Sequence, residues 1–244
     1  MKVIKTNDYD AMSKKAAEFI YEAIKNKPDI TLGLATGSTP HRMYDYLADM
    51  LNENKIDLSK VHTVNLDEYV GLGEGDPQSY HHFMHEEFFN KVDIPLENTH
   101  LPDGKAADLK AETESYEQLI KDLGGIDLQL LGVGRNGHIG FNEPGTPFDS
   151  TTQVVELTDL TIKDNSRFFE RVEDVPTEAL SMGLKTIMDT KSILFLASGA
   201  GKHDAVDALL NGEVTEDIPV TILQKHDDVT VIVDKEAAGE CIRS

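Results

Sequence analysis

Apolar and polar residues follow two kinds of pattern along this chain, short apolar runs and longer runs with a helical period. The first helical run covers residues 9–26, where Met12, Ala16, Ile20 and Ile24 recur every four positions and would share one face. Short apolar runs have the length and composition of buried strands. They predict strands over 2–5, 30–35, 61–66, 128–133, 152–157, 192–198 and 229–234. The helical periods predict helices over 9–26, 40–52, 80–90, 107–123, 176–188 and 202–210.

The order of these elements indicates the fold class. Predicted strands and helices alternate along most of the chain, as they do in successive βαβ units. Such units build an α/β fold with a doubly wound, mostly parallel sheet that carries helices on both faces, in a modified Rossmann-like arrangement. The sequence contains neither an internal repeat nor a linker of low complexity, so we expect residues 1–244 to form a single domain.

Composition and charge exclude several classes of partner. Hydrophobic residues make up 39% of the 244 positions, enough for a core, yet no run reaches the roughly 18 apolar residues that span a bilayer. The first residues carry no apolar signal core, from which we expect a cytoplasmic protein. The net charge of −21 argues against nucleic acid and against anionic membranes as partners.

The acidic residues are spread along the chain, which predicts a solvated surface. Adaptation to a salt-rich cytoplasm is one hypothesis for that surface. An anionic substrate would need clustered cations and backbone N–H groups to overcome the overall negative field. The one cysteine, Cys241, cannot form a disulfide within the chain and is interpreted as an incidental thiol.

The turn after the strand at 30–35 is the first candidate binding site. Gly37 allows a close backbone approach, and Ser38 and Thr39 offer hydroxyl groups and a helix N-cap. Pro40 suits the first turn of the helix that follows. The free N–H groups and the positive dipole end of a helix favour anions, so the turn predicts a phosphate site. The alternative is a capped helix start without a ligand.

Two cations lie in other segments that are candidates for phosphate binding. Arg167 could bind a phosphate through its forked guanidinium group and Lys202 as a point charge. Residues 198–202 imitate the end of a Walker motif, but His203 stands where Ser or Thr is required, so a nucleotide P-loop is not expected. The alternative for each cation is an ordinary surface position.

The segment 134–145 is rich in glycine and follows the predicted strand at 128–133. It places His138 and Glu143 on an irregular loop at the carboxyl end of a central strand, where open α/β proteins carry their chemistry. His138 could move protons near neutral pH, Glu143 could orient it, and Asn136 could hold the histidine or a substrate hydroxyl. The alternatives are a structural turn and a dinucleotide site, because residues 132–137 match G-x-G-x-x-G, although no helix is predicted to follow.

Asp67 comes directly after the predicted strand at 61–66 and could act as a general base with a raised pKa. The alternative is an aspartate that caps the next turn. His81, His82 and His85 lie on a predicted helix, but no Asp or Glu brackets them at a known ligand spacing. We therefore expect neither a metal ion nor another cofactor.

Together, several motifs resemble the glucosamine-6-phosphate deaminase family in order and spacing over essentially the whole chain. They lie at 32–40, 65–69, 132–145, 165–169 and 198–202. The wider superfamily, which includes the 6-phosphogluconolactonases, shares the phosphate loop. Asn-Leu-Asp-Glu-Tyr at 65–69 and His-Ile-Gly-Phe-Asn-Glu-Pro at 138–144 favour the deaminase.

The resemblance implies the conversion of glucosamine 6-phosphate and water to fructose 6-phosphate and ammonia, without a cofactor, in amino sugar catabolism. It implies that His138 moves the proton that opens the pyranose ring. Asp67 would take the proton from C2 and return it at C1 through an enolamine, and Glu143 would orient His138. The implied phosphate ligands are Gly37, Ser38, Thr39, Arg167 and Lys202.

The sequence departs from the family pattern at Asn136, where many members carry Asp. We therefore expect the group that opens the ring to titrate lower than in those relatives. The chain also looks short beside the hexameric, allosteric members, from which we expect no activation by N-acetylglucosamine 6-phosphate. The oligomeric state stays open. The rival functions are a 6-phosphogluconolactonase-like hydrolase and a non-catalytic sugar-phosphate sensor.

Overall fold

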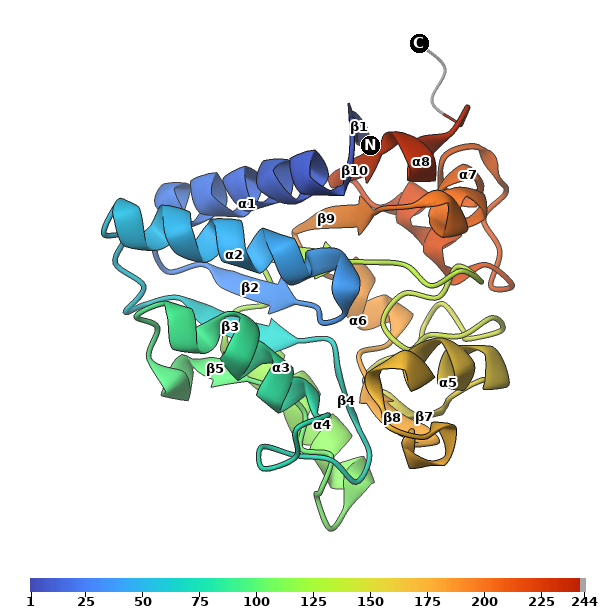
Figure 1. Ribbon diagram of the computed structural model, residues 1–244. Coiled ribbons are helices and arrows are strands. Elements are labelled where there is room, and N and C mark those ends of the chain that lie inside the picture. The colour runs from blue at the N-terminus through green and yellow to red at the C-terminus, as the bar shows by residue number, and fades with distance from the viewer. Residues whose placement is uncertain (242–244) are drawn as a thin grey trace.

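The computed structural model describes residues 1–241 and is built around a seven-stranded sheet in the order β1-β10-β9-β6-β2-β3-β5 (Figure 1). Each neighbouring pair in this sheet runs parallel, which confirms the predicted α/β fold class. Its strands are β1 (Lys2–Thr6), β2 (Thr31–Leu34), β3 (His62–Asn65), β5 (Thr99–His100), β6 (Leu128–Leu131), β9 (Ser192–Ala197) and β10 (Val229–Asp234).

The helices largely follow the predicted periods. They are α1 (Tyr9–Asn26), α2 (Ser38–Glu53), α3 (Tyr80–Glu87), α4 (Leu109–Asp122), α5 (Asp159–Asn165), α6 (Leu184–Met188), α7 (His203–Asn211) and α8 (Lys235–Ala238). Asp8 and Asp108 cap α1 and α4 by accepting backbone N–H groups of the first turn. Within residues 1–241, every helix is too short or too polar to cross a membrane.

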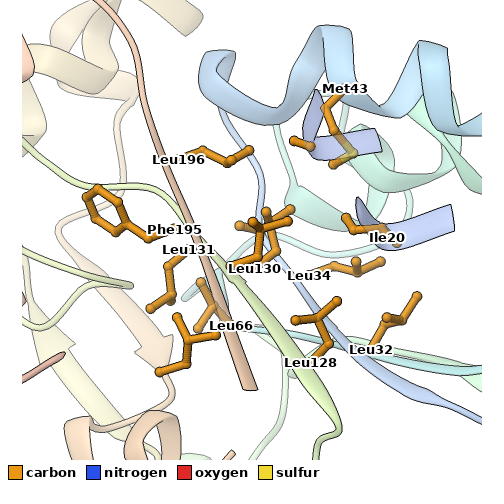
Figure 2. Close-up of a cluster of buried hydrophobic side chains, with 14 of the residues drawn as sticks. Ile20, Leu32, Leu34, Met43, Leu66, Leu128, Leu130, Leu131, Phe195 and Leu196 are labelled. Carbon is orange, nitrogen blue, oxygen red and sulfur yellow. The ribbon is translucent and has the colours of Figure 1, made fainter. Parts of the chain in front are cut away.

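The main core lies between the sheet and the adjacent helices α1 and α2 (Figure 1). All four positions of β2 and of β6 are buried, which explains why leucine predominates in both strands. Figure 2 shows Ile20 of α1 and Met43 of α2 among the leucines of these two strands. Full burial of a side chain of this size contributes about 1.5–3 kcal/mol, so this cluster fixes the centre of the sheet from which the candidate site projects.

A second, antiparallel sheet joins β4 (Asp67–Tyr69), β8 (Glu178–Ser181) and β7 (Gln153–Glu156) in the order β4-β8-β7. It shows that the helix predicted over 176–188 is wrong, because 178–181 is a strand and only 184–188 is helical. Pairing on both sides of β8 overrides the local apolar spacing. Gly183 separates the two elements, and a Cβ atom there would lie 2.2 Å from the Ser150 carbonyl oxygen.

The order in which strands are added to the main sheet changes side between β2 and β6, although all strands run parallel. From β2 it continues to β3 and β5 on one side, whereas β6 leads to β9 and β10 on the other. Neighbouring strands whose connections diverge in this way open a crevice beyond their carboxyl ends. The segments after β2 and β6 are the predicted phosphate turn and the loop that carries His138.

Candidate active site

The turn after β2 has the form of an anion site, with one correction to the predicted cap. Helix α2 begins at Ser38, and Gly37 is its N-cap with a φ of 100° and no side-chain hydrogen bond. The prediction that Ser38 and Thr39 cap the helix is therefore wrong, since both belong to its first turn. Glycine adopts this left-handed conformation without strain, and the two hydroxyl groups are left for a ligand.

The structure brings Arg167 to this turn from a distant segment. Its Nη2 atom donates a hydrogen bond to Ser38 Oγ over 3.2 Å. Arg167 lies in the short 3-10 helix Ser166–Phe168, directly after α5. The guanidinium group is exposed and stacks over the Phe168 ring at 4.7 Å from its centroid, which leaves it accessible to an anion.

Lys202 reaches the same region from the turn after β9. Its Nζ atom donates to the Val133 carbonyl oxygen over 2.7 Å. Burial, and then the positive charge of Arg167, lower the pKa of this lysine. Buried Asp234 supports the turn, because it accepts the Ser198 hydroxyl proton at 2.5 Å and the Gly199 N–H at 3.1 Å.

Sequence reasoning missed Asp234. Its position at the end of β10, followed by a helix that it caps, was the available signal.

The loop after β6 lets the His138 ring lie against its own backbone. A Cβ atom at Gly134 would come within 2.0 Å of His138 Cε1. Gly134 N–H donates to the His138 carbonyl oxygen over 2.9 Å, and Gly137 has a φ of 85°. Residues 134–137 form a turn, and the helix that a dinucleotide-binding turn requires does not start there.

A chain of hydrogen bonds fixes the tautomer of His138. Asn136 Nδ2 donates to Glu143 Oε2 over 2.9 Å, so Asn136 Oδ1 is the atom that faces His138 Nδ1 at 2.7 Å. An amide oxygen only accepts, and therefore Nδ1 carries the ring proton while Nε2 keeps a free lone pair. The sequence predicted that Glu143 orients His138. In the structure Asn136 lies between the two side chains, and His138 Nδ1 is 3.7 Å from Glu143 Oε2.

Burial is the main cause that lowers the pKa of His138, and the negative charge of Glu143 partly opposes it. A neutral imidazole with Nε2 unprotonated can accept a proton at neutral pH.

Helix α5, which the sequence analysis did not predict, supports this loop at two points. Thr161 Oγ1 donates to Glu143 Oε1 over 2.5 Å. Asp164 accepts hydrogen bonds from Arg135, with Nε at 2.9 Å. The helix therefore links residues 134–145, the candidate acid–base loop, to Arg167, which follows the helix in the chain. A threonine N-cap at Thr158, followed by an acidic residue, was the sequence signal for this helix.

Asp67 opens β4 just beyond the end of β3 and is only 7% exposed. Burial, with a smaller contribution from the charge of Glu68, raises its pKa to about 8. Within residues 1–241 no hydrogen bond stabilises the charged form of this carboxyl group. A buried carboxyl group of this kind accepts a proton readily once it is ionised.

Helix α3 carries the three histidines His81, His82 and His85. Among residues 1–241, no three His, Cys, Asp or Glu side chains are arranged to hold a metal ion. His81 instead faces Glu68, with Nδ1 at 2.7 Å from Oε2.

Comparisons with known proteins identify the family of this chain. The family model of glucosamine-6-phosphate isomerases and 6-phosphogluconolactonase matches residues 6–232. Glucosamine-6-phosphate deaminases of Thermoanaerobacter pseudethanolicus and Shouchella clausii are each 53% identical over 98% of this chain and cover 94% and 97% of their own lengths.

Among solved structures, a monomeric glucosamine-6-phosphate deaminase superposes with a TM-score of 0.96 and 48% identity over 98% of this chain and 99% of its own. The 6-phosphogluconolactonase of Trypanosoma brucei has a TM-score of 0.79 at 20% identity, covering 98% of both chains, and shares the fold. This chain belongs to the family of glucosamine-6-phosphate isomerases and 6-phosphogluconolactonases.

Proposed function

We propose that this protein is a glucosamine-6-phosphate deaminase, which converts glucosamine 6-phosphate and water to fructose 6-phosphate and ammonia. The observation that carries the proposal is a neutral histidine with a free Nε2 atom at the same edge of the sheet as a buried carboxyl group without a hydrogen-bonding partner among residues 1–241. The half-identical relatives that bear this name support it.

We assign the opening of the pyranose ring to His138. Its Nε2 atom accepts the proton of the hydroxyl group on C1 and returns it to the ring oxygen, so the C1–O5 bond breaks without net proton transfer to solvent. Asn136 holds the ring through Nδ1–H, and Glu143 holds Asn136, which keeps Nε2 directed outward throughout. The lowered pKa keeps the imidazole neutral at the start.

We assign the isomerisation to Asp67 and the release of ammonia to hydrolysis by water. Ionised Asp67 takes the proton from C2 to give an enolamine and returns it at C1. The aldehyde oxygen gains one proton and the ammonium group on C2 loses one, which leaves a hydroxymethyl group at C1 and an iminium group at C2. Water adds to this iminium group and ammonia departs, so that the ketose remains. Because the pKa of Asp67 is about 8, its ionised fraction, and with it kcat/KM, rises as the pH rises through that value.

The phosphate end is assigned to three loops. Gly37, Ser38 and Thr39 supply the N-terminal N–H groups and hydroxyls of α2, Arg167 a forked cation and Lys202 a point charge. These groups act at a distance from the reacting carbons, so their binding energy serves to align C1 and C2 with Asp67. They also supply the local positive charge that a dianionic substrate needs on a protein with a net charge of −21.

The test is release of ammonia from glucosamine 6-phosphate by the purified protein without added metal. We expect release that falls at least a thousandfold in Asp67→Asn, whose side chain is isosteric but cannot accept the proton. Transfer of solvent deuterium to C1 of fructose 6-phosphate separates this reaction from lactone hydrolysis, which breaks no C–H bond. Hydrolysis of 6-phosphogluconolactone without ammonia release would instead support the rival hydrolase.

We infer that the protein acts as a monomer, because its described residues superpose closely on a deaminase described as monomeric. Light scattering after gel filtration measures this directly. Hyperbolic kinetics that N-acetylglucosamine 6-phosphate leaves unchanged are the expected companion result.

A further inference from the structure

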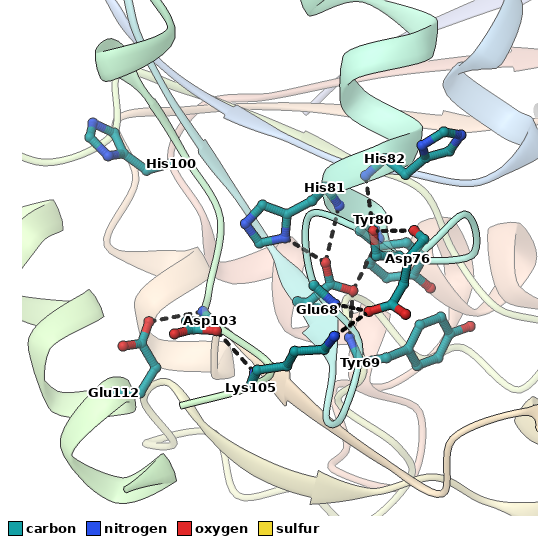
Figure 3. A network of polar contacts seen from close by, with 12 residues as sticks. Glu68, Tyr69, Asp76, Tyr80, His81, His82, His100, Asp103, Lys105 and Glu112 are labelled. Atoms are coloured by element: carbon teal, nitrogen blue, oxygen red, sulfur yellow. Dashed lines mark hydrogen bonds and ion pairs between the residues drawn. The ribbon is translucent and has the colours of Figure 1, made fainter. Parts of the chain in front are cut away.

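Glu68, the neighbour of Asp67 on β4, is a fully buried carboxylate that the proposed reaction does not use. Successive side chains of a strand point to opposite faces, so the two carboxyl groups lie on either side of β4. Figure 3 shows Glu68 between β4 and the start of α3, close to Tyr69 and His81. A buried charge of this kind requires partners, and the surrounding residues supply them.

Four hydrogen bonds hold the Glu68 carboxylate. Oε1 accepts the backbone N–H groups of Tyr69 at 2.8 Å and Tyr80 at 3.0 Å. Oε2 accepts the backbone N–H of His81 at 3.0 Å and lies 2.7 Å from its Nδ1 atom. An ionised carboxylate only accepts, so this Nδ1 atom carries a proton. Three of the four donors belong to the first turn of α3, whose dipole also favours a negative charge.

Glu68 is also the charged group that acts on Asp67. Its negative charge adds to burial in raising the pKa of Asp67. The other titratable groups that face Asp67 are Tyr69 on β4, Tyr80 on α3 and Tyr116 on α4. Burial raises the pKa of each tyrosine, so all three are uncharged at neutral pH and leave Glu68 as the electrostatic neighbour.

We propose that Glu68 and His81 are positioning residues for Asp67, with Glu68 fastening β4 to the start of α3 and His81 balancing the charge that Glu68 places beside the proton-transfer group. The proposal rests on the role proposed above for Asp67. It gives the His81 ring a function at the active site although the ring lies on the other side of β4 from the Asp67 carboxyl group.

His81 offers the sharper test, because it borders an open pocket of about 470 Å³ where a different side chain fits without disturbing the core. His81→Leu removes the side-chain donor to Glu68 Oε2 and leaves the backbone N–H donor in place. His81→Asn retains the side-chain donor, since the Asn amide nitrogen occupies nearly the position of the His Nδ1 atom. His82→Asn is the matched control, because the His82 ring points away from Glu68 in Figure 3.

The measurement is the pH dependence of kcat/KM from pH 5.5 to 9.5. With one hydrogen-bond donor lost, the negative charge of Glu68 raises the pKa of Asp67 further. We therefore expect the acidic limb of the kcat/KM profile of His81→Leu to move up by about half a pH unit. In His81→Asn and in His82→Asn, the acidic limb should stay at the pH found for the wild-type protein. Glu68→Gln removes the charge and should move the limb down by about one unit.

Opposite shifts in His81→Leu and Glu68→Gln distinguish this role from general damage to the fold, which would admit water to Asp67 and lower its pKa in both variants. An unmoved limb in His81→Leu, or a fall in kcat that His81→Asn does not rescue, would overturn the proposal. If Glu68→Gln does not fold, the pH profiles of His81→Leu and His81→Asn still test the proposal.

A titration of the Asp67 carboxyl carbon by ¹³C NMR gives the same answer without activity. It separates a failure of this inference from a failure of the proposed function, in which the wild-type protein releases no ammonia or Asp67→Asn retains the activity.

Discussion

Asn136 separates His138 from Glu143, and this single residue sets the orientation and the tautomer of the histidine. Its amide oxygen accepts a hydrogen bond from His138 and its amide nitrogen donates one to Glu143. Asn136 therefore orients the His138 ring without placing a charge beside it. A carboxylate at this position would hold Nδ1–H equally well but would also stabilise the imidazolium form. The sequence predicted that Asn136 could hold the histidine, but its amide bridge to Glu143 depends on the folded loop.

Asn136→Asp should raise the pKa of His138 by about one unit, because a negative charge is brought to within hydrogen-bond distance of the ring. A ¹H–¹⁵N NMR titration of the imidazole measures this shift, and the acidic limb of kcat/KM should become steeper as a second group titrates there. Asn136→Ala controls for loss of the hydrogen bond alone. An unchanged titration in Asn136→Asp would contradict the prediction.

Asp67 should make the folded state less stable as the pH rises. In the unfolded chain its carboxyl group ionises near pH 4, whereas burial raises the pKa to about 8 in the folded protein. Between these values the folded state binds one more proton, so the free energy of unfolding falls with increasing pH.

Asp67→Asn removes this contribution. We expect it to raise the free energy of unfolding at pH 9 by roughly 2–4 kcal/mol, with little difference at pH 4. Urea titrations of both proteins at the two pH values measure this. A difference independent of pH would show that Asp67 is not buried in its charged form.

At the scale of elements, the positions of the loops could be predicted because parallel strands place their carboxyl ends at one edge. The central strands could be predicted because each is a short segment in which apolar residues predominate, as in β2 and β6. Strand β8 was not readable, because its pairing with β4 and β7 comes from segments over a hundred and about twenty-five residues away. Helix α5 has only seven residues, too few for a clear period.

Helix α5 connects the acid–base loop to the proposed phosphate site. Arg135→Gln should loosen this connection and remove one positive charge near Lys202. An exposed ion pair contributes about 0.2–1 kcal/mol, so we expect KM for glucosamine 6-phosphate to rise by up to about fivefold while kcat stays within twofold.

Arg171→Gln is the matched control for this variant. It breaks a similar exposed pair, with Asp174, that does not touch the acid–base loop. Steady-state kinetics of the two variants decide the matter, and equal KM values in both would contradict a role for α5.

For the molecule as a whole, the net charge of −21 implies strong repulsion within the folded state. Chloride salt screens this repulsion, with a Debye length of about 3 Å at 1 M. We expect the melting temperature to rise by several degrees between 0.05 and 1 M KCl. Calorimetry measures it, and chloride is chosen because sulfate also strengthens apolar burial. A flat melting temperature would count against adaptation to salt.

The order β9-β6-β2-β3 places four functional loops in a row along one edge of the sheet. Lys202 follows β9, His138 follows β6, residues 37–39 follow β2 and Asp67 lies beyond β3, while Arg167 reaches the turn after β2 from the end of α5. Since neighbouring strands are about 4.8 Å apart, the sheet sets a fixed span between the phosphate and the carbons that exchange protons. A sugar phosphate one carbon shorter would anchor at the same end yet leave its second carbon short of Asp67. We therefore expect the spacing of the strands to select substrates by length, and shorter sugar phosphates to be competitive inhibitors.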